Sequence, residues 1–183
     1  EDILRDLALK NYPYEKITIA SSSLGQGFVG KSLAQVARDQ KTTPQAAVLN
    51  LLTAAKDQVL VFWHDLEESI LEELLKHPLA IIATDGSGFS ADERLPNQAP
   101  HPRSFGTTAE VLGKYVREKK LLTLETAIHK MSGLPAAWLG LKNRGLLVKN
   151  NFADVVVFDP EKIKNLSSYA NPFRYPAGIH QVA

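Results

Sequence analysis

The sequence predicts an α/β protein, and three observations lead to this prediction. Segments of strand character and segments of helix character alternate between residues 14 and 85. Two of the strand-like segments, at 59–63 and 79–84, are apolar throughout, which is typical of strands buried on both faces of a parallel sheet. A single helical segment connects these two, which is the arrangement of a βαβ unit.

The first predicted elements are a strand, a glycine-bearing loop and two helices. Residues 14–20 alternate and carry β-forming side chains, which predicts a short strand. The loop reads GQGFVG at 25–30, but no second strand with an acid at its tip follows, so a flexible loop is favoured over a nucleotide-binding fingerprint. An amphipathic helix is predicted at 32–40. Thr43 is then expected to cap a second helix that starts at Pro44.

The next predicted elements lead to a lone acid at the end of a strand. Asp65 and Glu68 stand in capping-box spacing and predict a helix, which should stop at the His-Pro pair at 77–78. The apolar run LAIIAT at 79–84 is predicted to be the following strand, and Asp85 comes directly after it.

A long loop is predicted after this acid, at 86–106. Structureless loops of about 20 residues are uncommon and often form lids or binding loops. A capping box at Thr107 predicts the start of the next helix, and Gly133 and Gly140 are predicted to close two further ones. These three helices are expected at 107–121, 123–133 and 134–141.

The character of the sequence changes near residue 142. Residues 143–160 predict two short strands around a turn, and the chain ends in another strand-like run. We therefore expect a first region at 1–142 and a second, made of β-structure, at 143–183.

Composition and charge exclude several classes of protein. The formal net charge is +1, which gives no electrostatic case for binding nucleic acid or an anionic membrane. Cysteine is absent, so this chain can form neither disulfides nor thiolate metal sites. No apolar run approaches the ~20 residues that a membrane span needs. The compartment stays open, with the cytoplasm favoured, and both ends read as cuts in a longer chain.

Four residues are the main candidates for chemistry. Asp85 is expected at the carboxyl end of a strand, where ligands of parallel α/β sheets bind, and could move a proton from a nucleophilic water to a leaving amine. Its alternative role is to cap a turn with Gly86. Arg103, with His101 close by in the sequence, has a planar guanidinium that could bind an anionic substrate. The alternative is that Arg103 is an ordinary surface residue. His64 is either a ligand, an acid–base group or a structural residue.

A set of motifs, taken in order, carries a family resemblance. The motifs are IIATDG, HPRSFGT, VLGKYVREKKLLTLETAIHKMSGLPAAWLGLKNRGLL, ADVVVFDP and NPFRYPAGI. They resemble the C-terminal part of the N-acyl-D-amino-acid deacylases, or D-aminoacylases, of the amidohydrolase superfamily. The match covers nearly all of residues 79–183 and is looser over 14–78. One motif alone would be unspecific, whereas the ordered set is specific.

The resemblance implies the C-terminal part of a (β/α)8 TIM-type barrel followed by strands of a small β-sandwich domain. It implies a metal-dependent hydrolase in which a zinc-bound water attacks the amide of an N-acyl-D-amino acid, releasing a D-amino acid and a carboxylate. Asp85 matches the family's acid–base residue and could also bind zinc. Arg103 matches the residue that grips the α-carboxylate of the substrate, with His101 in the same motif. The other zinc ligands of the family lie upstream of the matched region.

We therefore expect a piece of a longer enzyme, inactive by itself, whose partner is the missing N-terminal part of the same enzyme. One alternative keeps the fold and changes the substrate to a cyclic amide, as in dihydroorotases and hydantoinases. The other alternative is an inactive barrel fragment that serves as an interaction module.

Overall fold

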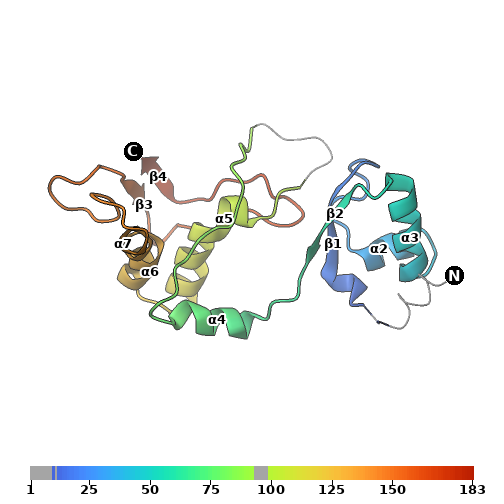
Figure 1. The fold of residues 1–183 in the computed structure, drawn as a ribbon, viewed down its shortest axis with the longest axis horizontal. Coiled ribbons are helices and arrows are strands. Elements are labelled where there is room, and N and C mark those ends of the chain that lie inside the picture. Colours follow the sequence, from blue (N-terminus) through green and yellow to red (C-terminus); the bar gives the residue numbers. More distant parts are fainter. Residues whose placement is uncertain (1–9, 11, 93–98) are drawn as a thin grey trace. The chain divides into compact units, whose positions relative to one another are not determined.

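The structure is a computed structural model that describes residues 10, 12–92 and 99–183, shown as a ribbon in Figure 1. The chain divides into two compact units, each described below by itself. The first unit comprises the described residues of 1–65, 92–101 and 169–172. The second unit comprises 66–91, 102–168 and 173–183. This division rests on contacts within the chain, and the boundary expected near 142 stays a prediction.

The first unit is built on a two-stranded antiparallel sheet. A short 3-10 helix, η1 (Tyr14–Lys16), leads into β1 (Ile17–Ser22), which pairs with β2 (Val59–Trp63). The pairing starts with Ile17 opposite Trp63. The first predicted strand is therefore confirmed, although it starts later than expected.

Two capped helices complete the first unit, and both are confirmed predictions. They are α2 (Leu33–Asp39) and α3 (Pro44–Ala55). The side-chain oxygens of Ser32 and Thr43 accept a backbone N–H of the first turn at 3.1 and 3.2 Å, which satisfies donors that have no partner inside the helix. The core of the unit lies between these helices and β1, and its larger members are Tyr14, Ile17, Ile19, Leu33, Val36 and Leu51.

The prediction that 59–63 is a strand of a parallel sheet, buried on both faces, is wrong. β2 pairs antiparallel with β1, and Leu60 and Trp63 remain 60% and 50% exposed. An apolar run shows that a segment can be buried, but neighbouring elements decide which of its faces are covered.

The strand predicted at 79–84 is not formed either, so the predicted βαβ unit is also wrong. The segment has no regular secondary structure, and Leu79 is 78% exposed. A strand needs a hydrogen-bonding neighbour, and no other described strand pairs with this segment. Its contact is with a helix instead, because the Ile82 N–H donates to the Lys130 carbonyl at 3.1 Å.

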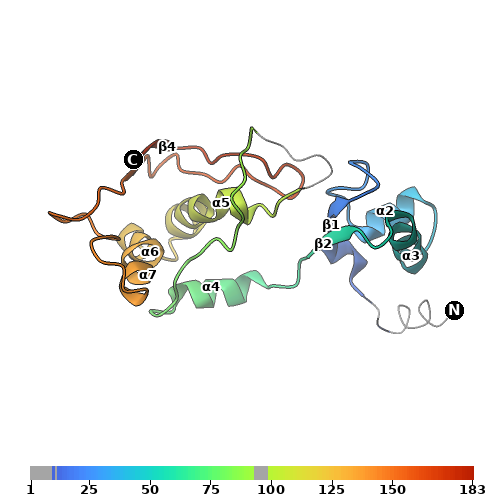
Figure 2. The same cartoon turned by 45° about the horizontal axis from the view of Figure 1, so that its top comes forward.

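Helices dominate the second unit, and Figure 2 shows two of them, α6 (Leu124–Met131) and α7 (Gly133–Trp138), adjoining each other. Helix α5 continues directly into the π-helix η2, so the two form one rod. The unit's core lies where α4, this rod and α6 meet, around Leu75, Tyr115 and Ile163. The bounds of these helices are α4 (Glu68–Lys76), α5 (Arg103–Glu110), η2 (Val111–Glu118), α6 (Leu124–Met131) and α7 (Gly133–Trp138). No described helix of the chain is both long and apolar enough to cross a membrane.

Both capping boxes predicted in this unit are wrong. The first predicted box has Asp65 as its N-cap, but helix α4 starts after Glu67, which makes no side-chain cap. The Glu68 carboxylate of that box is bound instead by two lysines from later in the chain. Helix α5 starts at Arg103, and the Thr107 hydroxyl donates to the Arg103 carbonyl at 3.0 Å inside it. Pro102, with φ −52°, provides the helical entry.

The predicted helix ends are partly confirmed. Helix α4 ends directly before His77, as its His-Pro pair predicted. Gly140, with φ +67°, follows α7 in the left-handed conformation expected of a closing glycine. Gly133, however, opens α7 rather than closing the helix before it.

The C-terminal strands form a second small sheet, in which β3 (Val156–Phe158) pairs antiparallel with β4 (Ile179–Val182). These two strands confirm the predictions for the end of the chain. The strand predicted earlier in 143–160 is not formed, since Gly145 and Asn150 have φ of +83° and +73°, which a strand does not accommodate.

Candidate active site

Asp85 and Arg103 were predicted separately, and the structure brings them into contact within the second unit. Nη2 of Arg103 lies 2.8 Å from Oδ2 of Asp85. Nε of Arg103 donates to the backbone carbonyl of Asp85, also at 2.8 Å. Two donors of one guanidinium thus bind the side chain and the backbone of one residue, which fixes the orientation of the fork.

The backbone around Asp85 is shaped for this contact. Asp85 has φ +45°, a left-handed conformation that Asp tolerates better than most residues. The Gly86 N–H donates to the Thr84 hydroxyl at 3.2 Å. A Cβ at Gly86 would lie 2.7 Å from the Ser104 Cα, so only glycine allows this loop to lie so close to the first turn of α5.

Because both side chains are exposed to solvent, the ion pair between Asp85 and Arg103 is weak. The side chains of Asp85 and Arg103 are 86% and 44% exposed. Exposed ion pairs contribute only about 0–1 kcal/mol. An anion that offers Arg103 a better partner can therefore displace the Asp85 carboxylate at small cost.

His101 lies in the first unit, although it stands close to Arg103 in the sequence. Its Nε2 is 3.0 Å from the Tyr169 hydroxyl. Its ring contacts Phe62 and Tyr169 edge to face, with centroids 5.0 and 5.1 Å apart. The substrate-binding role predicted for His101 stays a prediction.

His64, which the sequence left open, belongs to the same aromatic group. Its Nε2 lies 3.0 Å from the Thr18 hydroxyl across the sheet, and its ring centroid is 4.3 Å from that of Tyr169. These contacts favour a structural role for His64. Tyr169 joins both histidines, and no motif in the sequence singled it out.

Sequence reasoning also missed Lys130, which holds the segment that leads to Asp85. Its side chain is 3% exposed. Its ammonium group donates to the carbonyls of His77 and Ala80, the latter at 3.2 Å. Carbonyls near a helix C-terminus carry partial negative charge, so they stabilise this buried cation. A lysine near the end of a helix gives no sequence signal for burial.

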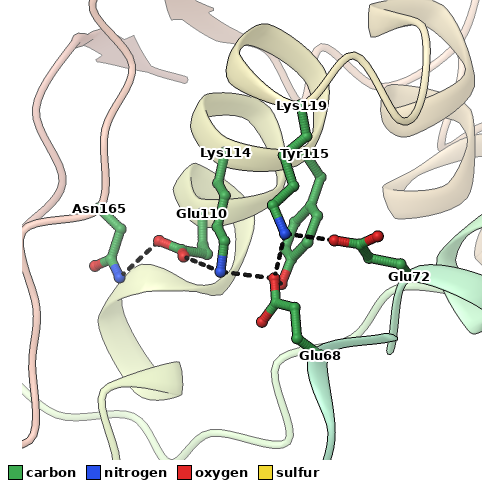
Figure 3. A network of polar contacts seen from close by, with 7 residues as sticks. All are labelled: Glu68, Glu72, Glu110, Lys114, Tyr115, Lys119 and Asn165. Carbon is green, nitrogen blue, oxygen red and sulfur yellow. Dashed lines mark hydrogen bonds and ion pairs between the residues drawn. The ribbon is translucent and has the colours of Figure 1, made fainter. Parts of the chain in front are cut away.

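A polar network joins α4 to the rod of α5 and η2 within the second unit (Figure 3). Glu68 lies 2.7 Å from Lys114 and 2.9 Å from Lys119, and accepts from the Tyr115 hydroxyl at 2.9 Å. Hydrogen bonds from Lys114, and then from Lys119 and Tyr115, lower the pKa of Glu68 to about 2. The network consists of Glu68, Glu72, Glu110, Lys114, Tyr115, Lys119 and Asn165.

A complete metal site is not present in the part of the chain that the structure describes. Within residues 10, 12–92 and 99–183, no group of three or more His, Cys, Asp or Glu residues could hold a metal ion. Zinc needs three or four such ligands. Asp85 could supply at most one of them, so the described residues alone do not fit a zinc ion.

Curated proteins resemble the chain over most of its length, although no family model matches it. An N-acyl-D-aspartate deacylase of Alcaligenes xylosoxydans is 36% identical over 84% of this chain and 28% of its own length. A D-aminoacylase of the same organism is 37% identical over 97% of this chain and 37% of its own length. The chain spans about a third of the length of these curated relatives.

A solved structure agrees with these relatives. The N-acyl-D-glutamate deacylase of Bordetella bronchiseptica, solved with zinc and a phosphonate mimic of the tetrahedral intermediate, matches with a TM-score of 0.78 and 31% identity. The match covers 99% of this chain and 35% of that one. A dihydroorotase of Desulforapulum autotrophicum is 43% identical, but over only 52% of this chain.

The fold, which mixes helices and sheet, is therefore that of part of an amidohydrolase. Within the amidohydrolases, the chain is a relative of the N-acyl-D-amino-acid deacylases, and this confirms the resemblance inferred from its motifs.

Proposed function

We propose that this chain is the C-terminal part of a zinc-dependent amidohydrolase that converts N-acyl-D-amino acids to a D-amino acid and a carboxylate. The observation that carries the proposal is the contact between Asp85 and Arg103, at 2.8 Å, in a chain related to deacylases of this kind. The contact unites an acid–base group with an anion-binding group, and hydrolysis of an N-acyl amino acid needs both.

Arg103 binds the α-carboxylate of the substrate in this proposal. Its Nη2 now binds the Asp85 carboxylate, while its Nε is held by the Asp85 carbonyl. The bond to the backbone carbonyl keeps the guanidinium oriented when an incoming carboxylate takes over the Nη2 side. Because the exposed ion pair is weak, this exchange costs little.

The exchange leaves the Asp85 carboxylate available as a proton carrier. Asp85 accepts a proton from the attacking water as the water oxygen bonds to the acyl carbon. It then delivers that proton to the amide nitrogen as the C–N bond breaks, so the leaving group departs as a neutral amine.

Zinc, when bound, would supply activation of the water and polarisation of the acyl carbonyl. Residues outside this chain must provide most of its ligands, because the described residues hold no ligand cluster and Asp85 offers one carboxylate. The missing N-terminal part of the same enzyme is the partner that this requires. In that assembly, 1–142 would complete a (β/α)8 TIM-type barrel and 143–183 would join a small β-sandwich domain.

His101 remains a proposed contributor to substrate binding, on the family motif alone. The loop predicted at 86–106 ends earlier than expected, because α5 starts at Arg103. The loop that remains would border the substrate, and the structure describes it up to 92 and from 99. The substitution His101→Gln, with kcat/KM as the measurement, would distinguish direct substrate binding by His101 from a structural role through its contact with Tyr169.

Substitution of Arg103 tests the proposal directly. In the full-length enzyme, Arg103→Ala should weaken binding of an N-acetyl-D-amino acid by about 2–5 kcal/mol, because the α-carboxylate loses its charged partner. The measurement is kcat/KM with free and amidated N-acetyl-D-amino acids. The loss should vanish for the amidated substrate, which has no carboxylate.

Arg144→Ala is the matched control. Arg144 has the same 44% side-chain exposure as Arg103 and also pairs with an aspartate, Asp154. It should leave kcat/KM unchanged. If kcat/KM of the Arg103→Ala enzyme equalled that of this control, Arg103 would not be a substrate-binding residue.

Cyclic amides are the second candidate substrates, because dihydroorotases match about half of the chain. A cyclic amide without a carboxylate, such as a hydantoin, offers nothing for Arg103 to bind. Turnover of such a substrate that survives Arg103→Ala, together with no turnover of N-acyl-D-amino acids, would favour this alternative. Dihydroorotate does carry a carboxylate, so for that substrate the test is which compound is turned over, and not the effect of Arg103→Ala.

A further inference from the structure

We propose that Phe173 and Tyr175 are positioning residues that clamp the loop after Asp85 onto the start of α5. Both come from the NPFRYPAGI motif, which the mechanism above leaves without a role. The proposal rests on the proposed function, because it concerns how the Asp85–Arg103 geometry is maintained.

The clamp reaches the loop through two contacts. The rings of Phe89 and Phe173 meet edge to face, with centroids 6.4 Å apart and planes at 84°. The backbone N–H of Ala91 donates to the Tyr175 hydroxyl at 3.2 Å. Loop residues 86–91 have no regular secondary structure, so anchoring must come from other segments.

The same two residues also contact the helix that carries Arg103. Phe105, in the first turn of α5, lies 6.0 Å from Phe173 and 5.7 Å from Tyr175 between ring centroids. Both pairs have the edge-to-face geometry that aromatic rings prefer. Phe173 is 8% exposed, so it is the packed centre of the group.

The clamp therefore joins the two segments that hold the candidate catalytic pair. Asp85 immediately precedes the loop, and Arg103 is the first residue of α5. The close approach of Gly86 to Ser104 also joins these segments. Small displacements of a reacting group are costly for catalysis, so a loosened clamp should impair turnover before it impairs folding.

Tyr175→Phe in the full-length enzyme tests the clamp, because it removes only the hydroxyl that accepts from Ala91. Amide hydrogen exchange at 86–91 should accelerate by about five- to ten-fold, as expected for one lost hydrogen bond. With N-acetyl-D-amino acids, kcat should fall by roughly three- to ten-fold while KM stays within about two-fold. The temperature of unfolding should change little.

Tyr115→Phe is the matched control. It removes a hydroxyl of the same unit that donates to Glu68 at 2.9 Å. It should lower thermal stability and leave both kcat and exchange at 86–91 unchanged. Equal behaviour of the two variants, with unaltered exchange and kcat for Tyr175→Phe, would overturn the proposal.

A second variant changes the loop residue that contacts Phe173. Phe89→Leu keeps an apolar side chain but loses the ring contact with Phe173, and it should lower kcat in the same way; an unchanged kcat would count against the clamp.

If the wild-type enzyme did not hydrolyse N-acyl-D-amino acids, the proposed function would fail. Exchange at 86–91 would then decide the existence of the clamp separately.

Discussion

Asp85 lies on an exposed loop in contact with Arg103, whereas the sequence placed it at the tip of a buried strand. Both candidate residues were identified from residue type and sequence order. Their contact was not, because it depends on Gly86 allowing its loop to approach Ser104. Lys130 and Tyr175 were missed because each acts through a partner far away in the chain.

Asp85→Asn in the full-length enzyme is expected to lower kcat by about 10²–10⁴-fold, since the amide cannot carry the proton from water to the leaving amine. KM should change much less, because Arg103 keeps its backbone partner at Asp85. Steady-state kinetics with an N-acetyl-D-amino acid provide the measurement, and zinc content should be measured in parallel. Near wild-type kcat in the zinc-loaded variant would show that Asp85 is not the acid–base residue.

Elements with local signals were predicted well, and elements with non-local requirements were not. Helix α2 was predicted from its own amphipathic pattern, and α3 from the cap at Thr43, which needs only a donor three residues away. The capping box at Asp65 failed because Glu68 forms distant ion pairs instead. The strand prediction for 79–84 failed because a strand needs a neighbouring strand to pair with. The apolar run alone does not show whether such a neighbour exists.

The network between α4 and η2 predicts how the stability of the second unit depends on pH. The pKa of Glu68 is lowered from 4.5 to about 2 in the folded chain. Its ionised form therefore stabilises the fold fully above pH 4.5, and this contribution is lost as pH falls toward 2. Because the side chain is 45% exposed, the contribution to the free energy of unfolding should be only about 1 kcal/mol.

Glu68→Gln should reduce the free energy of unfolding by that amount at pH 7, and the two proteins should converge near pH 2. Urea unfolding across this pH range makes the measurement. Glu73→Gln, on the same helix but outside the network, is the control. A constant difference between wild type and Glu68→Gln from pH 7 to 2 would contradict the account.

At the scale of the whole molecule, large apolar side chains remain exposed. Leu66, Leu79 and Trp138 are 91%, 78% and 76% exposed. Each of these side chains would be removed from water if another part of a longer protein packed against it. These residues suit the proposal that the rest of a longer enzyme packs against this chain, since the chain spans only about a third of its relatives.

The interaction-module alternative makes a different prediction at this scale. A native protein of this length that is oligomeric and binds no zinc would support that alternative. A longer native protein with near-stoichiometric zinc would support the enzyme.

One assay compares the account with its alternatives most directly. The 183-residue chain and the full-length protein are supplied with zinc and assayed in parallel on N-acetyl-D-amino acids and their L-enantiomers. We expect turnover of the D-enantiomers by the full-length protein and none by the chain alone, because the chain lacks a complete zinc site in its described residues. Robust turnover by the isolated chain, or none by the zinc-loaded full-length protein, would contradict the central claim.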